Sequence, residues 1–187
     1  MFGQPYNLFM GIESDIKIEL VTSKELYNCA MSVRRNVFVK EQGIAEDKEF
    51  DGNDFCAAHV VAYIQKKYKK FPVGTMRIRF FSDFAKFERM AVIPRFRKTD
   101  VSENIMQFGF NYVSEKGYRT VYGMCKKELL TRWKKCGYSN ISGAESIEQN
   151  DMELIPIKKT LSKNSKALTL KSNPKLLTLK EGSWSDR

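Results

Sequence analysis

The residues with the clearest chemical potential form two groups, and the first combines one arginine with several carboxylates. Arg34 is followed along the chain by Glu49, Asp51 and Asp54. Such a set, placed at a helix end and in the loop after it, can grip the carboxylate and the ammonium group of an amino acid. Arg34 can equally pair with Glu49 or Asp51 and do no more than fix the loop. These residues alone are compatible with both interpretations.

The second group is a basic loop between a strand and a helix. Residues 87–93 are predicted to form a short buried strand that Pro94 ends, and a loop carrying Arg97 and Lys98 leads into a helix that runs to about Lys116. Backbone N–H groups at a helix start have no intrahelical acceptor, and the helix dipole adds partial positive charge there. This order of elements predicts a phosphate-binding site.

The rest of the chain supplies the elements that position these groups. Alternating apolar and polar residues predict a first strand at 15–22, and Ser23 is a candidate N-cap for the helix that follows. The other segments with strand or short-helix patterns are 57–64, 74–81, 120–125, 128–136, 139–147 and 152–161. Residues 65–73, rich in lysine, are expected to be a solvated loop between two strands. His59 is expected to be a hydrogen-bonded structural histidine, with a general-base role as the weaker alternative.

The central stretch resembles the acyl-donor signature of the GNAT superfamily of N-acyltransferases. That signature is a strand ending in Ala-Val, a Pro, and then Arg or Gln followed by spaced glycines that open a helix. Residues 91–94, Ala-Val-Ile-Pro, and Arg97 match it, whereas Lys98, Asp100 and Ser102 stand at glycine positions of the family. The resemblance implies a mixed α/β fold with a largely antiparallel central sheet and helices on both faces.

A second stretch, residues 34–54, resembles two branches of the superfamily. Small bacterial acetyltransferases carry Arg-x-x-Val-Phe-Val-x-Glu-Gln-Gly and then Glu-Phe-Asp, whereas autoinducer and N-acyl amino acid synthases carry Arg-x-x-Val-Phe and then Glu-x-Asp-x-x-Asp. Both patterns fit this segment. By resemblance, the candidate substrate-binding residues are Arg34, Phe38, Glu49, Asp51 and Asp54.

N-acyl transfer defines what the site must do. An amine loses a proton, attacks a thioester carbonyl polarised by a backbone N–H, and expels a thiolate. The resemblance places the polarising N–H groups near Met90, Ala91 and Val92, where neighbouring parallel strands splay apart. Alternation puts Glu88, Met90 and Val92 on one face of the strand, so Glu88 is the candidate general base. A structural ion pair of Glu88 with Arg89 or another neighbour fits the sequence as well.

The acyl donor is expected to be an acyl-CoA or an acyl carrier protein, and no metal is expected. Its candidate binding loop comprises Arg97, Lys98, Thr99, Asp100, Val101 and Ser102. A loop without glycines allows less close backbone approach, which suits the single phosphodiester of a carrier protein. A formal net charge of +10 would also steer the protein toward an acidic carrier. Side chains of Arg97 and Lys98 serve the phosphates of CoA equally well.

Two other functions compete with an enzyme that acylates a small-molecule amine or amino acid. A non-catalytic binding module on a degenerate GNAT scaffold is supported by the missing glycines and by Trp133, which stands where the family often has the tyrosine that protonates the leaving thiolate. A nucleic-acid binder has only the net charge in its favour, because the aromatic and basic surface motifs are lacking.

Length and composition bound the organisation of the chain. A chain of 187 residues with 42% hydrophobic content predicts one domain, at 16–161, between an N-terminal extension at 1–15 and a basic tail at 162–187. Within the tail, 166–171 and 175–180 are near-copies that form either a hairpin or a flexible extension.

The cysteines and the apolar runs bear on where the protein works. Cys29, Cys56, Cys125 and Cys136 lack the spacing of a metal site and are expected to be buried free thiols. No secretory leader and no membrane-spanning run are found, so a cytoplasmic protein is expected.

Overall fold

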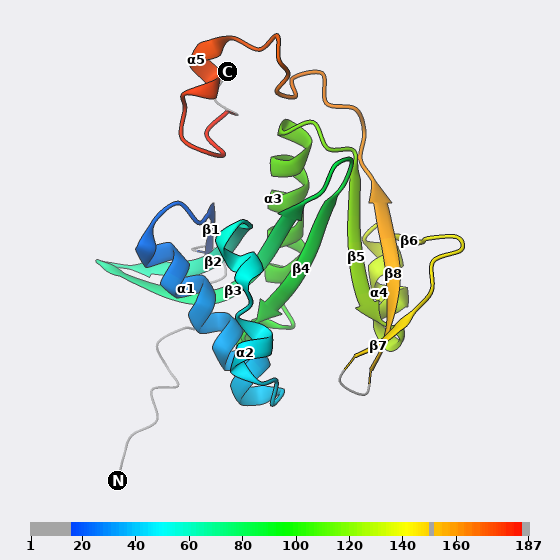
Figure 1. Ribbon diagram of the computed structural model, residues 1–187. Helices are drawn as coiled ribbons and strands as arrows, with labels where there is room; N and C mark the ends of the chain where they lie inside the picture. The colour runs from blue at the N-terminus through cyan, green and yellow to red at the C-terminus, as the bar shows by residue number, and fades with distance from the viewer. Residues whose placement is uncertain (1–15, 150–151, 185–187) are drawn as a thin grey trace.

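A single mixed sheet organises the computed structural model, which describes residues 16–149 and 152–184. The predicted extension at 1–15 lies outside the described residues. The eight strands are β1 (Ile16–Leu20), β2 (Ala58–Lys66), β3 (Lys69–Phe80), β4 (Ala85–Val92), β5 (Thr120–Lys126), β6 (Ser139–Asn140), β7 (Ile147–Gln149) and β8 (Met152–Thr160). Their order is β1-β2-β3-β4-β5-β8-β6, and β7 also pairs with β8. Only β4 and β5 pair in parallel (Figure 1).

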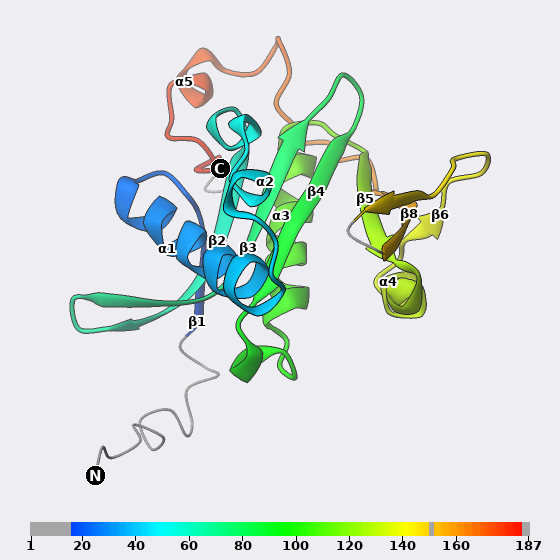
Figure 2. The same cartoon turned by 60° about the horizontal axis from the view of Figure 1, so that its bottom comes forward.

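Helices cover both faces of this sheet, as the resemblance implied. They are α1 (Lys24–Arg34), which continues as a π-helical segment (Arg35–Glu41), α2 (Glu46–Glu49), α3 (Val101–Glu115), α4 (Leu130–Lys135) and α5 (Pro174–Leu177), with 3₁₀ turns at Gly52–Phe55, Pro94–Phe96 and Lys127–Leu129. Figure 2 shows α1 and α2 in front of β2 to β4 and α3 behind them. Among the described residues, no helix is long and apolar enough to cross a membrane.

Local signals in the sequence account for the helix boundaries. The Ser23 hydroxyl accepts a hydrogen bond from the Leu26 N–H at 3.3 Å and caps α1 as predicted. Gly137, with φ of +84°, follows α4 in the left-handed conformation that favours glycine after a helix.

The larger core lies between the sheet and α3. Phe87 of β4 stacks on Phe110 of α3 with ring centroids 5.3 Å apart, and Gly109 allows this close approach. A Cβ at Gly109 would lie 2.5 Å from Met76 Cε and 2.9 Å from Phe87 Cζ. A smaller core on the other face packs Leu26 and its neighbours on α1 against β2.

The solvated loop predicted at 65–73 is wrong. β2 and β3 extend through it and pair up to Lys66 opposite Lys69, which leaves a turn at Lys67 and Tyr68. Lys70 is not free in solvent but binds Glu25 of α1, with Nζ 2.7 Å from Oε2. The lysines were misinterpreted because an exposed hairpin end carries the same composition as a loop.

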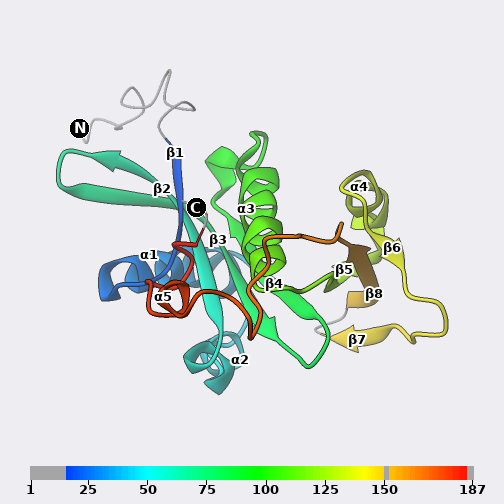
Figure 3. The same ribbon diagram turned by 90° about the horizontal axis from the view of Figure 1, so that it is seen from above.

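Of the two alternatives for the tail, a hairpin is not formed, because the described tail residues contain the short helix α5 and no strand. The tail instead folds back over α3 (Figure 3). Trp184 is 4% exposed and stacks on Tyr112 of α3, and Tyr112 donates a hydrogen bond to Glu181. The Leu168 N–H bonds to the Glu115 carbonyl at the end of α3. The boundary at residue 161 stays a prediction.

The cysteine prediction holds in part. All four described cysteines are free, and Cys125 is buried, but Cys56 is exposed. Cys56 follows the 3₁₀ turn at Gly52–Phe55, which lies at the surface and exposes Phe55 as well.

Candidate active site

The candidate site lies where β4 and β5 separate. These two strands pair only through Ala85–Phe87 and Val121–Gly123, and β4 then continues to Val92 and β5 to Lys126 with no further pair recorded between these two fully described strands. The parallel strands therefore splay, as the resemblance implied. An opening between strand ends exposes backbone groups that a sheet would otherwise pair.

A β-bulge interrupts β4 inside this opening. Glu88 lies opposite Arg77 and Ala91 opposite Thr75, so that Arg89 and Met90 together face a single residue of β3. Arg89 takes a left-handed φ of +53°, which strains a residue other than glycine. A bulge leaves the backbone of the extra residue outside the ladder.

The bulge also changes which side chains share a face. Met90 and Val92 pack with the core on the α3 side, whereas Glu88 bonds Arg77 on the side of α1 and α2. The expectation that Glu88, Met90 and Val92 lie on one face is therefore wrong for Glu88. The strict alternation on which it rested requires an uninterrupted strand.

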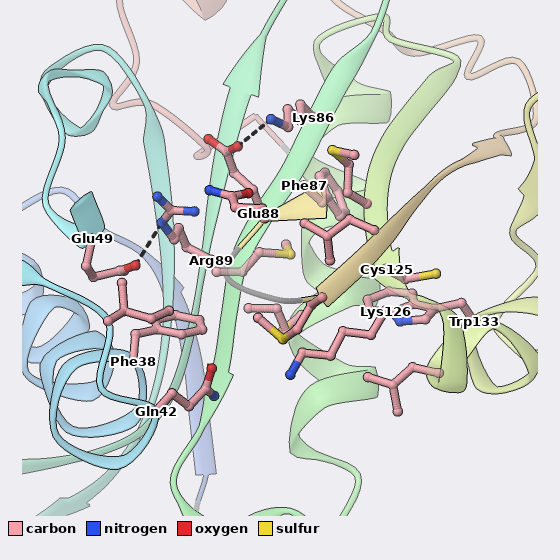
Figure 4. A pocket seen from close by; sticks show the side chains of 18 of the residues that line it. Phe38, Gln42, Glu49, Lys86, Phe87, Glu88, Arg89, Cys125, Lys126 and Trp133 are labelled. Carbon is pink, nitrogen blue, oxygen red and sulfur yellow. Dashed lines mark ion pairs between the residues drawn. The ribbon is translucent and has the colours of Figure 1, made fainter. Parts of the chain in front are cut away.

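Two cavities occupy the opening, and the space free of protein atoms, counted out to open solvent, is about 1230 Å³ in the larger and about 860 Å³ in the smaller. The larger one is bounded by β4, the ends of β5, β7 and β8, and the π-helical segment (Figure 4). The smaller one lies toward the start of α3. The two share lining residues, namely Gln42, Met90, Met106, Leu129 and Trp133. The two cavities are therefore neighbours, and together, from the N-terminus of α3 to the middle of β4, they are called the channel.

The structure brings part of the predicted donor site into this channel. Met90 lines both cavities, and Ala91, Val92, Arg97 and Ser102 line the smaller one. The remaining predicted residues, which line neither cavity in the part of the chain that the structure describes, are Lys98, Thr99, Asp100 and Val101.

Local contacts show how the start of α3 is arranged. Arg97 donates to both carboxylate oxygens of Glu41, at 2.7 and 2.6 Å, and to the Val92 carbonyl. Asp100 occupies the N-cap position but makes no side-chain capping bond. Val101 belongs to the core, at 2% exposure. The first turn of α3 therefore keeps backbone donors that its own cap does not use.

The predicted substrate-binding arginine is enclosed in ion pairs. Arg34 is 0% exposed, with Nε 2.6 Å from Glu49 Oε1 and Nη1 2.6 Å from Asp54 Oδ1. Its Nη2 donates to the Glu49 carbonyl and to Asp54. Arg34 and Asp54 do not line the channel, and neither does Asp51, whereas Phe38 and Glu49 line the larger cavity. The arrangement favours the alternative that Arg34 fixes the loop, with Asp54 in addition to Glu49 as its partner.

Arg77 is the residue that sequence reasoning missed. Its side chain is 1% exposed and binds Asp51, Asp54 and Glu88, with Nη1 2.6 Å from Asp51 Oδ1. Arg77 alternates with apolar residues along β3, which is typical of a solvent-facing position. The sequence did hold one indication of such a residue. Three carboxylates, Glu49, Asp51 and Asp54, follow Arg34, and buried carboxylates need cationic partners.

Glu88 is held between two cations. Its Oε1 lies 2.8 Å from Arg77 Nη2 and its Oε2 lies 2.8 Å from Lys86 Nζ (Figure 4). Burial would raise the pKa of Glu88, but the ion pairs with Lys86 and Arg77 outweigh burial and lower that pKa. The structural pairing named from the sequence exists with these residues rather than with Arg89. Glu88 still lines the larger cavity, and its role as a base stays a prediction.

Arg89 ties the bulge to the acidic loop. Its Nε lies 2.9 Å from Glu49 Oε2, and its Nη2 donates to the Lys48 carbonyl at 3.1 Å (Figure 4). Burial raises the pKa of Glu49 and outweighs the opposing effects of Arg34 and Arg89. The strained backbone of Arg89 is therefore stabilised by contacts with α2.

His59 behaves as the structural histidine that was predicted. It is 4% exposed, and its Nε2 donates to the Asp54 carbonyl at 3.1 Å. Burial lowers the pKa of His59, which keeps the ring neutral. Outside the channel, His59 is not placed to act on a substrate there.

Comparisons with known proteins agree with this geometry. No family model matches the chain. The uncharacterized N-acetyltransferase YjcF of Bacillus subtilis (strain 168) is 28% identical over 133 residues, which cover 71% of this chain and 92% of the relative. A crystal structure from Lactobacillus plantarum, whose name gives N-acetyltransferase activity as provisional, has a TM-score of 0.72 at 22% identity and covers 79% of this chain and 99% of the other. The chain has the GNAT fold.

A third similarity reaches the other GNAT branch. The CoA-dependent acyl-homoserine lactone synthase BjaI, solved with SAM and isopentyl-CoA, has a TM-score of 0.63 at 14% identity and covers 79% of this chain and 84% of BjaI. The predicted fold class is thus confirmed, and with the N-acetyltransferase relative from Bacillus subtilis the predicted resemblance to the GNAT superfamily is confirmed as well. Relatives named as acyl-transfer enzymes support the prediction of a GNAT-type enzyme over a binding module.

Proposed function

We propose that this GNAT protein transfers an acyl group from an acyl-CoA to the amine of a small molecule. One observation carries the proposal: the bulge at Arg89 and Met90 lies inside an opening between splayed parallel strands, and its residues line the channel. An extended pantetheine arm lying along β4 would bring its thioester carbonyl to the backbone N–H groups of the bulge, which polarise it.

The reaction then needs a proton acceptor and a leaving group. The amine nitrogen forms a bond to the carbonyl carbon, the C–S bond breaks to release the CoA thiolate, and the proton lost by nitrogen passes through water to Glu88, which returns it to solvent. Glu88 is ionised at neutral pH because Lys86 and Arg77 lower its pKa. Trp133, which lines both cavities, supplies no acid. The thiolate therefore takes its proton from solvent.

The start of α3 supports CoA as the donor. The first turn of α3 lacks a side-chain cap, so its N–H groups are available to phosphate, and Arg97 and Arg132 line the same cavity.

Methionines line the channel around the bulge, namely Met76, Met90, Met106, Met124 and Met152. Because methionine side chains adapt to irregular shapes, we infer that acyl groups longer than acetyl are accepted.

The donor is tested by binding. Purified protein is titrated with acetyl-CoA, octanoyl-CoA and octanoyl acyl carrier protein while its thermal unfolding is recorded. A ligand that binds only the folded state raises the unfolding temperature. We expect both CoA esters to raise it. A rise with the carrier protein alone would replace CoA with the carrier as donor, and no rise with any of them would refute the proposed function.

The proton acceptor is tested by substitution. Glu88→Gln keeps the size of the side chain and removes its basicity, so kcat should fall about 10²- to 10⁴-fold while the protein stays folded. The matched control is Glu153→Gln, because Glu153 is exposed and paired with Lys127 outside the channel. Equal activity of the two variants would remove Glu88 from the mechanism.

A further inference from the structure

The charged residues lining the larger cavity are not balanced. Two carboxylates line it, Glu49 and Glu88, and each is already paired with two cations. The cations that line it are Lys48, Lys86, Arg89 and Lys126. The cavity therefore carries more positive than negative side chains, and its carboxylates are neutralised from within the protein.

Two of these cations, Lys48 and Lys126, have no ion pair with the carboxylates of the cavity among the described residues; Lys48 is exposed to solvent, and Lys126 is half-buried. Lys126 lies at the end of β5, across the opening from the bulge of β4, and its amino group points into the cavity (Figure 4). Among residues 16–149 and 152–184, no hydrogen bond or ion pair is found for its Nζ. By contrast, Lys86 is bound to Glu88, and Arg89 to Glu49 and Asp51.

A cation with no partner among the described residues, placed in a partly enclosed cavity, favours an anionic ligand, because part of its hydration is lost. The acyl chain of the donor is neutral, and the donor phosphates belong near the start of α3, at the other end of the channel. The anion near Lys126 is therefore expected on the acceptor.

We propose that the acceptor is an amine that also carries a carboxylate, that is, an amino acid, and that Lys126 binds the carboxylate. This inference rests on the proposed function and names its substrate class. Lys126 takes the part that the sequence suggested for Arg34, whose guanidinium is occupied by Glu49 and Asp54. The same charge pattern disfavours acceptors that are only cationic, such as polyamines.

The test compares acceptors that differ only in the carboxylate. With octanoyl-CoA as donor, kcat/KM is measured for L-leucine and isoamylamine, L-phenylalanine and phenethylamine, and L-lysine and cadaverine. We expect at least one amino acid to be preferred over its amine by about ten- to a hundredfold, the range for a hydrogen bond to a charged group. In Lys126→Met the amino acid should lose this advantage while the amine stays within about twofold.

The control is Lys127→Met. It removes the same charge from the neighbouring residue, whose side chain is 68% exposed, pairs with Glu153 and does not line the channel. Equal kcat/KM within every pair for the unmodified protein, or a loss in Lys126→Met that affects both members of a pair alike, overturns the proposal.

If no acceptor is turned over, the proposed function fails, and the role of Lys126 is then tested by a binding measurement. The same amino acids and amines are titrated by calorimetry into protein saturated with CoA. Binding of an amino acid that Lys126→Met abolishes and Lys127→Met retains supports the carboxylate site, whereas absence of amino acid binding overturns it.

Discussion

Replacing Arg34 with alanine distinguishes the two interpretations of this residue, namely that it binds the substrate or that it fixes the loop carrying Glu49 and Asp54. Arg34 is 0% exposed, and its partners Glu49 and Asp54 are 1% and 4% exposed. Removing one member of a buried ion pair leaves an uncompensated charge and destabilises a protein by about 3–5 kcal/mol. Here Glu49 keeps Arg89 and Asp54 keeps Arg77, so we expect the lower end, about 3 kcal/mol.

The measurement is urea unfolding of Arg34→Ala together with its thermal midpoint. For a chain of this length, about 3 kcal/mol corresponds to a fall of about 6–12 °C. The matched control is Arg35→Ala, because Arg35 is exposed and pairs with the exposed Glu46. An exposed pair contributes about 0–1 kcal/mol, so this variant should remain close to the unmodified protein.

Kinetics complete the experiment. Below the midpoint of Arg34→Ala, its KM for the amine acceptor should equal that of Arg35→Ala, because Arg34 does not line the channel. If Arg34→Ala unfolds like the control and its KM for the acceptor rises, the structural interpretation is refuted and Arg34 binds the substrate.

Two further predictions concern charge and packing. Burial raises the pKa of Asp51, but hydrogen bonds from Arg77 outweigh burial and lower that pKa to about 2. The free energy of unfolding should therefore fall from about pH 4 toward pH 2. When it is measured across this pH range, Asp51→Asn should show a shallower fall. If the free energy of unfolding falls as steeply with pH in Asp51→Asn as in the unmodified protein, Asp51 is not the cause of the fall. Gly109→Ala should destabilise by about 1–3 kcal/mol in urea unfolding because its Cβ would lie 2.9 Å from Phe87 Cζ. Gly52→Ala, with no heavy atom within 4 Å of its Cβ, is the control, and equal midpoints would contradict the packing argument.

The sequence predicted the order of elements well, because their signals are local. Ser23 as a cap and the strand that ends in Ala91-Val92 both depend on neighbouring residues. The β2–β3 turn and the path of the tail were missed. The tail position depends on Trp184 meeting Tyr112, a contact between distant segments that no local pattern encodes.

The candidate site was predictable only in part, for the same reason. Met90, Ala91, Val92 and Phe38 line the channel, and their roles in binding stay predictions. The bulge of β4 was not foreseen, because it depends on the register with β3. Arg77 was missed because α2 and the turn after it cover a strand face that otherwise resembles an exposed one. No local pattern in the sequence marks Lys126, because only the separation of β4 and β5 places it at a cavity.

The short contact between β4 and β5 has a consequence for how such a protein can diversify. In the sheet, only three residue pairs join the half that carries the bulge to the half that carries β5 and β8, and the other contacts between the halves are made by side chains, many of them on α3. The ion pairs around Arg77 and Arg89 stiffen the first half, while the second half meets it along this narrow seam. Under the proposed function, substitutions on β5, β7 or β8 are therefore expected to reshape the wall that faces the acceptor while the bulge of β4 keeps its register with β3. Acceptor choice could then change in this architecture with little change in acyl activation.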